Sequence, residues 1–226
     1  MGRGHRAAEA PVSQGYFLAI AGNIGVGKTE LTTRLSVELG WMAYYEPVIQ
    51  NPYLDDFYAD MSRWSFHLQI YFLSERFKAQ VQIGSSPLPF IQDRTIYEDA
   101  EIFARVLHDQ GSMTAVDYRN YTSLFHVLVG FLRKPDLIVY LKASPDVLME
   151  RIARRGRASE QSISRDYIAR LNGAYDDWMR RARAETEVLE IDTDHVPLQG
   201  ETEAFAKLVG DLKARYPRQA MLDLGE

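Results

Sequence analysis

Short apolar runs alternate along the chain with longer segments whose apolar residues recur at helical spacing. The apolar runs predict strands at 16–21, 41–45, 88–92, 136–141 and 187–191. The periodic segments predict helices at 30–39, 52–60, 62–83, 97–110, 116–132, 164–183 and 201–215, and one from 145 into the basic stretch 151–157. Asn51 and Ser144 are expected to cap two of these helices, each with proline at the first position. The alternation predicts one α/β domain over 15–226, with a parallel sheet of about five strands and helices on both faces.

The turn after the first predicted strand has the pattern G-x-x-x-x-G-K-[ST]. Its residues are Gly22, Asn23, Ile24, Gly25, Val26, Gly27, Lys28 and Thr29. Glycines allow backbone N–H groups to converge on phosphate oxygens at a helix N-terminus. Lys28 is expected to contact the β- and γ-phosphates, and the Thr29 hydroxyl to bind Mg²⁺. The strand and helix on either side favour this interpretation over a glycine turn with an incidental Lys-Thr pair.

Composition limits the classes of function. The chain has 226 residues, 46% of them hydrophobic and 25% charged, with a net charge of −5, which argues against a general nucleic-acid binder. The absence of cysteine excludes disulfides and fits a cytoplasmic protein. No apolar run is long enough for a membrane span, and residues 1–14 are expected to be a disordered leader.

Charged residues end two of the predicted strands. Glu46 follows the second strand, where a carboxylate could accept the proton of an attacking hydroxyl. Asp93 and Arg94 follow the third strand, where they could hold Mg²⁺ and contact phosphate. The carboxyl ends of parallel strands share one edge with the phosphate loop. The alternative is that these are solvated surface charges.

A basic cluster beside Gly156 contains Arg151, Arg155 and Arg157. Arg151 and Arg155 share one helix face, and a glycine after the helix would allow a lid to move. Lid arginines can stabilise the charge of a transferring phosphoryl group. The alternative is a solvated charge run.

Polar and aromatic residues on two predicted helices suggest a nucleobase pocket. Gln69 and Arg76 share one helix face, and the Gln69 amide offers a donor and an acceptor. Asp99 and Phe103 lie four apart on another helix and could add a polar contact and a stacking surface. Core packing is the alternative for the aromatic residues.

Several motifs together resemble those of the deoxynucleoside kinase family, in the same order along most of the chain. They are GNIGVGKTEL at 22–31, EPV at 46–48, NPYLDDFY at 51–58, RWSFHLQIYFLSER at 63–76, DRTIYEDAEIF at 93–103 and RRGRASEQ at 154–161. The family includes deoxycytidine, deoxyguanosine and bacterial deoxyadenosine kinases. The resemblance implies a P-loop kinase fold with an arginine-rich lid, ATP as donor, Mg²⁺ and a homodimer formed through helices near 97–132.

The resemblance also implies roles for individual residues. Glu46 matches the general base for the 5′-hydroxyl, and Tyr58 and Glu160 match the pair that binds the 3′-hydroxyl of deoxyribose. The other implied roles are base recognition by Gln69, Arg76, Asp99 and Phe103, metal and phosphate binding by Asp93 and Arg94, lid arginines at Arg151, Arg155 and Arg157, and adenine binding near Asp192. The chain departs from relatives at Ile49–Asn51 and at Leu68, where aromatic residues occur in some of them.

The sequence therefore predicts transfer of the ATP γ-phosphoryl group to the 5′-hydroxyl of a deoxynucleoside. The charged pair Arg76 and Asp99 favours purine bases, or cytosine, over thymine, because thymidine-preferring relatives look apolar at these positions. A nucleoside monophosphate kinase of the thymidylate kinase type is the alternative, since it shares the phosphate loop and the lid. A regulatory nucleotide switch lacks support, because no guanine-recognition N-K-x-D motif is present.

Overall fold

Five strands form one parallel sheet in the computed structural model, which describes residues 14–45, 51–196, 198 and 200–217. The strands, in the spatial order β2-β3-β1-β4-β5, are β1 (Phe17–Gly22), β2 (Met42–Tyr44), β3 (Phe90–Asp93), β4 (Leu137–Lys142) and β5 (Glu187–Asp192). β1 pairs with β3 and β4 and is buried along its whole length, which explains its unbroken apolar sequence. The predicted five-stranded parallel sheet is confirmed.

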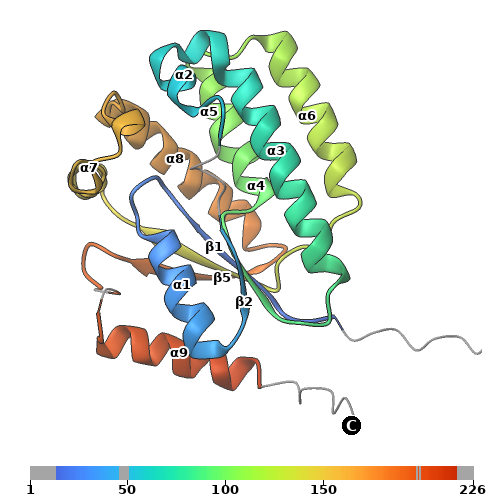
Figure 1. The fold of residues 1–226 in the computed structure, drawn as a ribbon, viewed down its shortest axis with the longest axis vertical. Coiled ribbons are helices and arrows are strands. Elements are labelled where there is room, and N and C mark those ends of the chain that lie inside the picture. The colour runs from blue at the N-terminus through green and yellow to red at the C-terminus, as the bar shows by residue number, and fades with distance from the viewer. Residues whose placement is uncertain (1–13, 46–50, 197, 199, 218–226) are drawn as a thin grey trace, which may run out of the picture.

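Helices lie on both sides of this sheet (Figure 1). α1 (Lys28–Leu39) and α9 (Glu203–Arg215) lie together on one side, while α3 (Met61–Ser85), α6 (Ala115–Val129) and α8 (Arg165–Ala182) lie on the other. Leu31, Leu35 and Leu39 of α1 are buried, as their helical spacing predicts. The shorter elements are α2 (Leu54–Ala59), α7 (Pro145–Arg155) and a 3₁₀ turn at Ala158–Glu160.

The helix expected at 97–110 is not a regular α-helix. α4 (Ile96–Glu98) continues into a π-helical segment (Asp99–Ala104) and then into α5 (Arg105–Asp109). Thr95 and Glu98 form a capping box that fixes the start of α4. The π-helical turn contains Asp99 and Phe103, so the irregular segment presents residues predicted to bind the substrate.

Two further expectations about helix starts need correction. α2 begins at Leu54, and its N-cap residue is Tyr53, not Asn51. The Asn51 side chain instead accepts a hydrogen bond from the Tyr53 backbone N–H at 2.9 Å, which makes a turn before the helix. Ser144 does occupy the N-cap position of α7 and Pro145 its first turn, but the serine side chain makes no capping hydrogen bond.

The ends of the sequence lie largely outside the described residues. Of the predicted leader 1–14, only Gln14 is described, and its amide donates a hydrogen bond to the Gly84 carbonyl at 3.2 Å. Across the described part of the chain, no helix combines the length and apolar character that a membrane crossing requires.

Candidate active site

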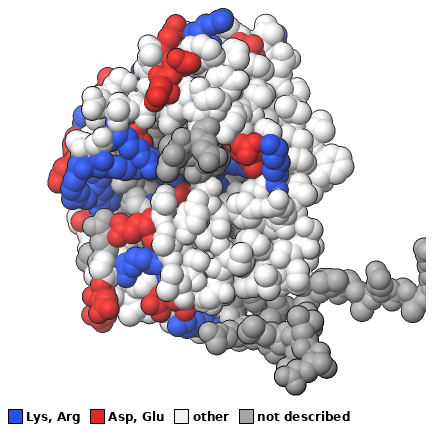
Figure 2. All heavy atoms as spheres, in the orientation of Figure 1, with Lys and Arg blue, Asp and Glu red and all other residues white. Residues whose placement is uncertain are grey.

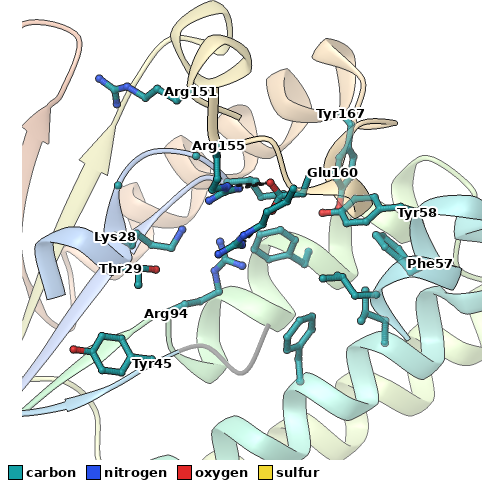
Figure 3. A pocket seen from close by; sticks show the side chains of 18 of the residues that line it. Lys28, Thr29, Tyr45, Phe57, Tyr58, Arg94, Arg151, Arg155, Glu160 and Tyr167 are labelled. Carbon is teal, nitrogen blue, oxygen red and sulfur yellow. Dashed lines mark hydrogen bonds and ion pairs between the residues drawn. The ribbon is translucent and has the colours of Figure 1, made fainter. Parts of the chain in front are cut away.

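A cavity of about 730 Å³ opens at the carboxyl ends of β1 and β3. Two ends of it can be distinguished (Figure 3). The loop end is formed by Gly25, Gly27, Lys28 and Thr29, and the helix end by Gln69, Phe72, Asp99 and Phe103. The residues predicted from separate motifs that also line it are Ile24, Tyr58, Arg94, Arg151, Arg155, Arg157 and Glu160.

Positive φ angles fix the path of the phosphate loop. Gly22, Gly25 and Gly27 have φ of 145°, 82° and 103°, a region that side-chain-bearing residues rarely adopt. A Cβ on Gly22 would also lie 2.5 Å from the Leu141 carbonyl oxygen of β4. Lys28 is buried and its Nζ donates to the Asn23 carbonyl at 3.0 Å, across the loop. The glycines and the Lys28 contact therefore hold the loop in a curled conformation.

Gly22 and Asn23 do not line the cavity but hold the loop from behind. The Asn23 amide donates to Asn172 Oδ1 at 2.6 Å and to the Ile168 carbonyl at 3.0 Å, both on α8. Its Oδ1 accepts from the Ile24 backbone N–H at 2.7 Å. The sequence predicted Asn23 as a nucleotide contact, whereas the structure shows its side chain joining the loop to α8.

The two predicted metal ligands lie in contact. The Thr29 hydroxyl donates to Asp93 Oδ2 at 2.5 Å, and Asp93 Oδ1 is buried without a hydrogen-bond partner among the described residues. Arg94 has a φ of 65° and its guanidinium lies 4.3 Å from the centre of the Phe103 ring. Its Nη2 donates to the Gly22 carbonyl at 3.4 Å. The end of β3 therefore places the Asp93 carboxylate and the Arg94 guanidinium beside the phosphate loop.

A buried ion pair supports the helix end. Arg76 Nε lies 2.5 Å from Asp99 Oδ2, and both side chains are 2% exposed. Arg76 Nη1 also donates to the Arg94 carbonyl at 3.0 Å and, more weakly, to the Asp93 carbonyl at 3.4 Å. Asp99 lines the cavity, whereas Arg76 stands behind it. The pair predicted from the sequence is thus formed, and it also links the helix end to the strand that carries Asp93.

Gln69 and Phe103 complete the helix end. The Gln69 side chain is buried, and its Oε1 has no hydrogen-bond partner among the described residues. An orphaned acceptor in a cavity wall costs free energy unless a bound molecule supplies a donor. Phe103 offers an aromatic surface in the same wall.

Arg155, the last residue of α7, and Arg157, just beyond it, contact one carboxylate. Glu160 is nearly buried and accepts two hydrogen bonds from Arg155, at 3.0 and 2.6 Å, and one from Arg157 at 3.3 Å. Tyr58 lies near Glu160 in the wall of the same cavity (Figure 3). Gly156 between the arginines has a φ of 69° and ends the helix. In the space-filling view, Lys and Arg side chains gather around α7 (Figure 2).

A second cavity of about 340 Å³ adjoins the loop on its other side. Arg151, which lines both cavities, donates to the hydroxyl of Thr193 at 2.8 Å and to its carbonyl at 2.9 Å. Thr193, Asp194 and Val196 line this cavity, but the predicted Asp192 does not. Asp192 instead accepts a hydrogen bond from the Asp194 backbone N–H at 3.0 Å.

Some lining residues were not identified from the sequence. Arg154 follows Arg151 by almost one helical turn and makes no hydrogen bond or ion pair with another described residue. Tyr45, Phe57 and Tyr167 also line the cavity, and burial raises the pKa of the Tyr167 hydroxyl. Arg154 and Phe57 adjoin predicted site residues in the sequence, whereas no local pattern marks Tyr167. Glu46, the predicted general base, lies outside the described residues.

The fold and the cavity together define a class of protein. Three features are typical of a P-loop phosphotransferase site. They are a glycine loop between β1 and α1, an aspartate at the end of a strand in contact with the loop threonine, and a cluster of arginines. The described residues contain no group of three or more His, Cys, Asp or Glu side chains placed to hold a metal ion by themselves.

Comparisons with known proteins identify the family. The profile of the deoxynucleoside kinase family matches residues 18–215. The deoxyadenosine/deoxycytidine kinase of Bacillus subtilis is 44% identical over 173 residues, which cover 76% of this chain and 80% of that protein. The deoxyadenosine kinase of Dictyostelium discoideum is 43% identical over 167 residues, covering 74% of this chain and 68% of that protein.

A solved structure agrees with these relatives. The deoxyadenosine kinase from M. mycoides with bound dATP superposes with a TM-score of 0.77 at 29% identity, covering 87% of this chain and 99% of that one. The chain therefore belongs to the deoxynucleoside kinase family and is a nucleoside kinase. The predicted family and P-loop kinase fold are confirmed, whereas the arginine-rich lid stays a prediction.

Because the Arg76–Asp99 pair is buried, its loss should be costly. Replacing Asp99 by Asn leaves the buried guanidinium without this counter-charge, and we expect the free energy of unfolding to fall by about 3 kcal/mol. Urea denaturation measures this change. The matched control is Asp146→Asn, which removes the exposed partner of Arg165 and should leave the urea midpoint almost unchanged. Equal midpoints for the two variants would contradict a structural role for the buried pair.

Proposed function

We propose that the enzyme transfers the γ-phosphoryl group of ATP to the 5′-hydroxyl of a deoxynucleoside, with a purine base or cytosine favoured over thymine. One observation carries this proposal: a single cavity joins the phosphate loop to a pocket that holds an orphaned amide oxygen, a buried carboxylate and an aromatic ring. Because the cavity is continuous, an acceptor can place its base at the helix end and its hydroxyl toward the loop end.

The helix end supports recognition of a base with amino groups. Gln69 Oε1 needs a donor, and Asp99, when ionised, can only accept hydrogen bonds. Adenine, guanine and cytosine carry exocyclic amino groups that can donate to such acceptors, whereas thymine has none. This complementarity is the physical basis of the proposed preference.

Tyr58 and Glu160 are proposed to bind the 3′-hydroxyl of deoxyribose. Glu160 is also the carboxylate that Arg155 and Arg157 contact. A sugar hydroxyl that binds Glu160 would therefore act directly on the two arginines proposed to close over the phosphates. This arrangement would couple occupancy of the acceptor site to the position of the lid arginines.

The donor is proposed to bind along the loop. Backbone N–H groups of the cavity-lining loop residues Gly25, Gly27, Lys28 and Thr29, and the Lys28 side chain, would contact its phosphates. Arg94, Arg151, Arg155 and Arg157 would neutralise further charge. The second cavity, which lies beside the loop and is lined by Thr193, Asp194, Val196 and Leu198, would hold the donor base. Its walls combine apolar side chains from the loop, α1 and β4 with the polar residues Glu30, Arg151, Thr193 and Asp194.

The residues at the loop end fit Mg²⁺. A threonine hydroxyl and a carboxylate with one orphaned oxygen are hard oxygen ligands, and Mg²⁺ in kinases is held by few protein ligands together with substrate phosphates. Thr29 and Asp93 would hold the ion, which would supply charge neutralisation between the donor phosphates. The hydrogen bond from Thr29 holds the Asp93 carboxylate beside the loop, where the ion would bind.

A panel of acceptors tests the proposed reaction. With Mg·ATP, we expect deoxyadenosine, deoxyguanosine or deoxycytidine to give the highest kcat/KM, and thymidine the lowest, because thymine cannot donate to Gln69 and Asp99 through an exocyclic amino group. The measurement is a coupled assay for ADP release. Preference for a nucleoside monophosphate would instead indicate a thymidylate kinase type of enzyme, and hydrolysis independent of acceptor would indicate a nucleotide switch.

Glu46 is proposed to accept the proton of the attacking 5′-hydroxyl. Replacing it by Gln keeps the size of the side chain but removes the base, so we expect kcat to fall by roughly 10²- to 10⁴-fold. Binding of the deoxynucleoside, measured by calorimetry, should change little. A matched control is Glu38→Gln, an exposed glutamate on α1 that lines neither cavity. Turnover like that of the wild type in Glu46→Gln would remove Glu46 from this role.

A homodimer is proposed through α6, which belongs to the predicted interface near 97–132, together with the adjacent helix α3. Large apolar side chains are exposed on these two adjacent helices and just beyond them: Val81 is 43% exposed, Val127 61% and Phe131 77%. Figure 1 shows α3 and α6 side by side at one edge of the molecule. A patch of this kind on a monomer typically marks an interface.

Introducing carboxylates into this apolar surface of α3 and α6 should separate the two subunits. We expect Val127→Asp combined with Phe131→Asp to give a monomer by size-exclusion chromatography with light scattering, because it would bury carboxylates in the interface. Val37→Asp is the control, since Val37 is 77% exposed but lies on α1. A monomeric wild type would refute the proposal.

A further inference from the structure

Glu98 is a completely buried carboxyl group behind the phosphate loop, and no step of the reaction uses it. Its Oε2 accepts from the Thr95 backbone N–H at 2.9 Å, as part of the capping box of α4. Its Oε1 accepts from the Gly22 backbone N–H at 3.2 Å and lies 2.8 Å from the Tyr175 hydroxyl oxygen. Glu98 therefore joins α4, the first residue of the loop and α8.

The Tyr175 hydroxyl has two oxygen neighbours but one hydrogen. It lies 2.8 Å from the Gly22 carbonyl oxygen as well as 2.8 Å from Glu98 Oε1. A carbonyl oxygen can only accept, so the contact with Gly22 is a hydrogen bond only if Tyr175 donates to it. The contact with Glu98 is then a hydrogen bond only if the proton belongs to Glu98. An ionised Glu98 would leave one of these short O···O contacts without a hydrogen.

We propose that Glu98 is a positioning residue that carries a proton in the folded enzyme, donates it to Tyr175, and so directs the Tyr175 hydroxyl onto the Gly22 carbonyl. Both polar backbone groups of Gly22 are then held, the N–H by Glu98 and the carbonyl by Tyr175. The inference rests on the proposed role of the loop in binding the donor phosphates.

The surroundings of Glu98 are consistent with the neutral form. Burial raises the pKa of Glu98, and the nearby positive charges of Arg94 and Lys28 oppose this rise. Arg94 Nε lies 3.8 Å from Oε1, beyond hydrogen-bond distance. The other titratable groups that face Glu98 are Tyr175 on α8 and Tyr140 on β4, and burial raises the pKa of both hydroxyls. Neither tyrosine brings a compensating positive charge.

The consequence for catalysis lies on the donor side. Gly22 begins the loop, and its carbonyl also accepts from Arg94. Loss of the Glu98–Tyr175 contact should therefore displace the loop and Arg94 together. Asp99, at the helix end, is held by its pair with Arg76 and not by Gly22 or Tyr175, so acceptor binding should be largely spared.

The proton is tested by unfolding as a function of pH. If the folded state keeps a proton that the unfolded chain releases, the folded state binds more protons between the two pKa values, and stability falls as pH rises through that window. This contribution is fully present below the ordinary Glu pKa and is lost as pH passes the raised value. The unfolding equilibrium constant of the wild type should then rise about tenfold per pH unit relative to Glu98→Gln, which cannot titrate.

Glu101→Gln is the matched control, because Glu101 lies three residues further along and pairs with Arg181 at the surface. Its stability profile should parallel that of the wild type over this window. An infrared difference spectrum between wild type and Glu98→Gln should also contain the carbonyl band of a protonated carboxylic acid. Parallel profiles for wild type and Glu98→Gln, or a carboxylate band in place of the acid band, would overturn the inference. These measurements need no catalysis, so the proposed function is unaffected by their failure.

Kinetics test the positioning role. Glu98→Ala and Tyr175→Phe should each lower kcat/KM for ATP by roughly 10- to 100-fold and leave the KM of the deoxynucleoside unchanged. The double variant should be no worse than the more damaging single variant, since both remove one shared contact. Glu98→Gln keeps a donor toward Tyr175 but loses the acceptor for the Gly22 N–H, so its activity should lie between those of the wild type and Glu98→Ala. Equal losses on donor and acceptor constants would show a merely structural role and overturn the proposal.

Discussion

The hydrogen bonds around Gly22 fix the one segment on which the rest of the site depends. At Gly22, where the chain leaves β1, φ is 145°, a conformation that glycine tolerates. A side chain at this position would also collide with the neighbouring carbonyl of β4. Glu98, Tyr175 and Arg94 then contact its backbone groups from three different elements. Glu98 and Tyr175 do not line the cavity, so they position the loop from behind and leave its inner surface open for phosphates.

The helix end and the loop end are not independent, because Arg76 contacts both. It pairs with Asp99 in the base pocket and donates to the backbone carbonyls of Asp93 and Arg94. Arg94 is the one described non-glycine residue with a positive φ. Two hydrogen bonds from Arg76 Nη1 help to stabilise the backbone at Asp93 and Arg94, with Asp93 in contact with Thr29 and the Arg94 guanidinium beside Gly22. The residue that supports base recognition thus also supports the end of β3.

The sequence was sufficient to predict the architecture and those site residues whose type is fixed by the chemistry that they perform. Buried parallel strands require unbroken apolar runs, and a phosphate loop requires glycine and lysine at fixed spacing, so both could be predicted without neighbours. The π-helical turn at 99–104 could not, because it inserts a residue into a helix without changing the apolar pattern. Asn23 lies within a nucleotide-binding motif, yet its side chain contacts α8, which is distant in sequence. Tyr167 and Tyr175 were missed for the same reason: their roles come from tertiary contacts alone.

Charge balance explains why a strongly charged cavity is stable before any ligand binds. Arg155 and Arg157 are paired with Glu160, Lys28 bonds within the loop, and Arg94 lies over the Phe103 ring. Each cation is thereby partly compensated, which limits the repulsion among them. If Glu98 is neutral, as proposed, then the loop end carries one negative charge fewer than its carboxyl groups suggest. The net positive potential left at the loop would favour a polyphosphate, and the acid behind Gly22 would contribute hydrogen bonds without weakening that attraction.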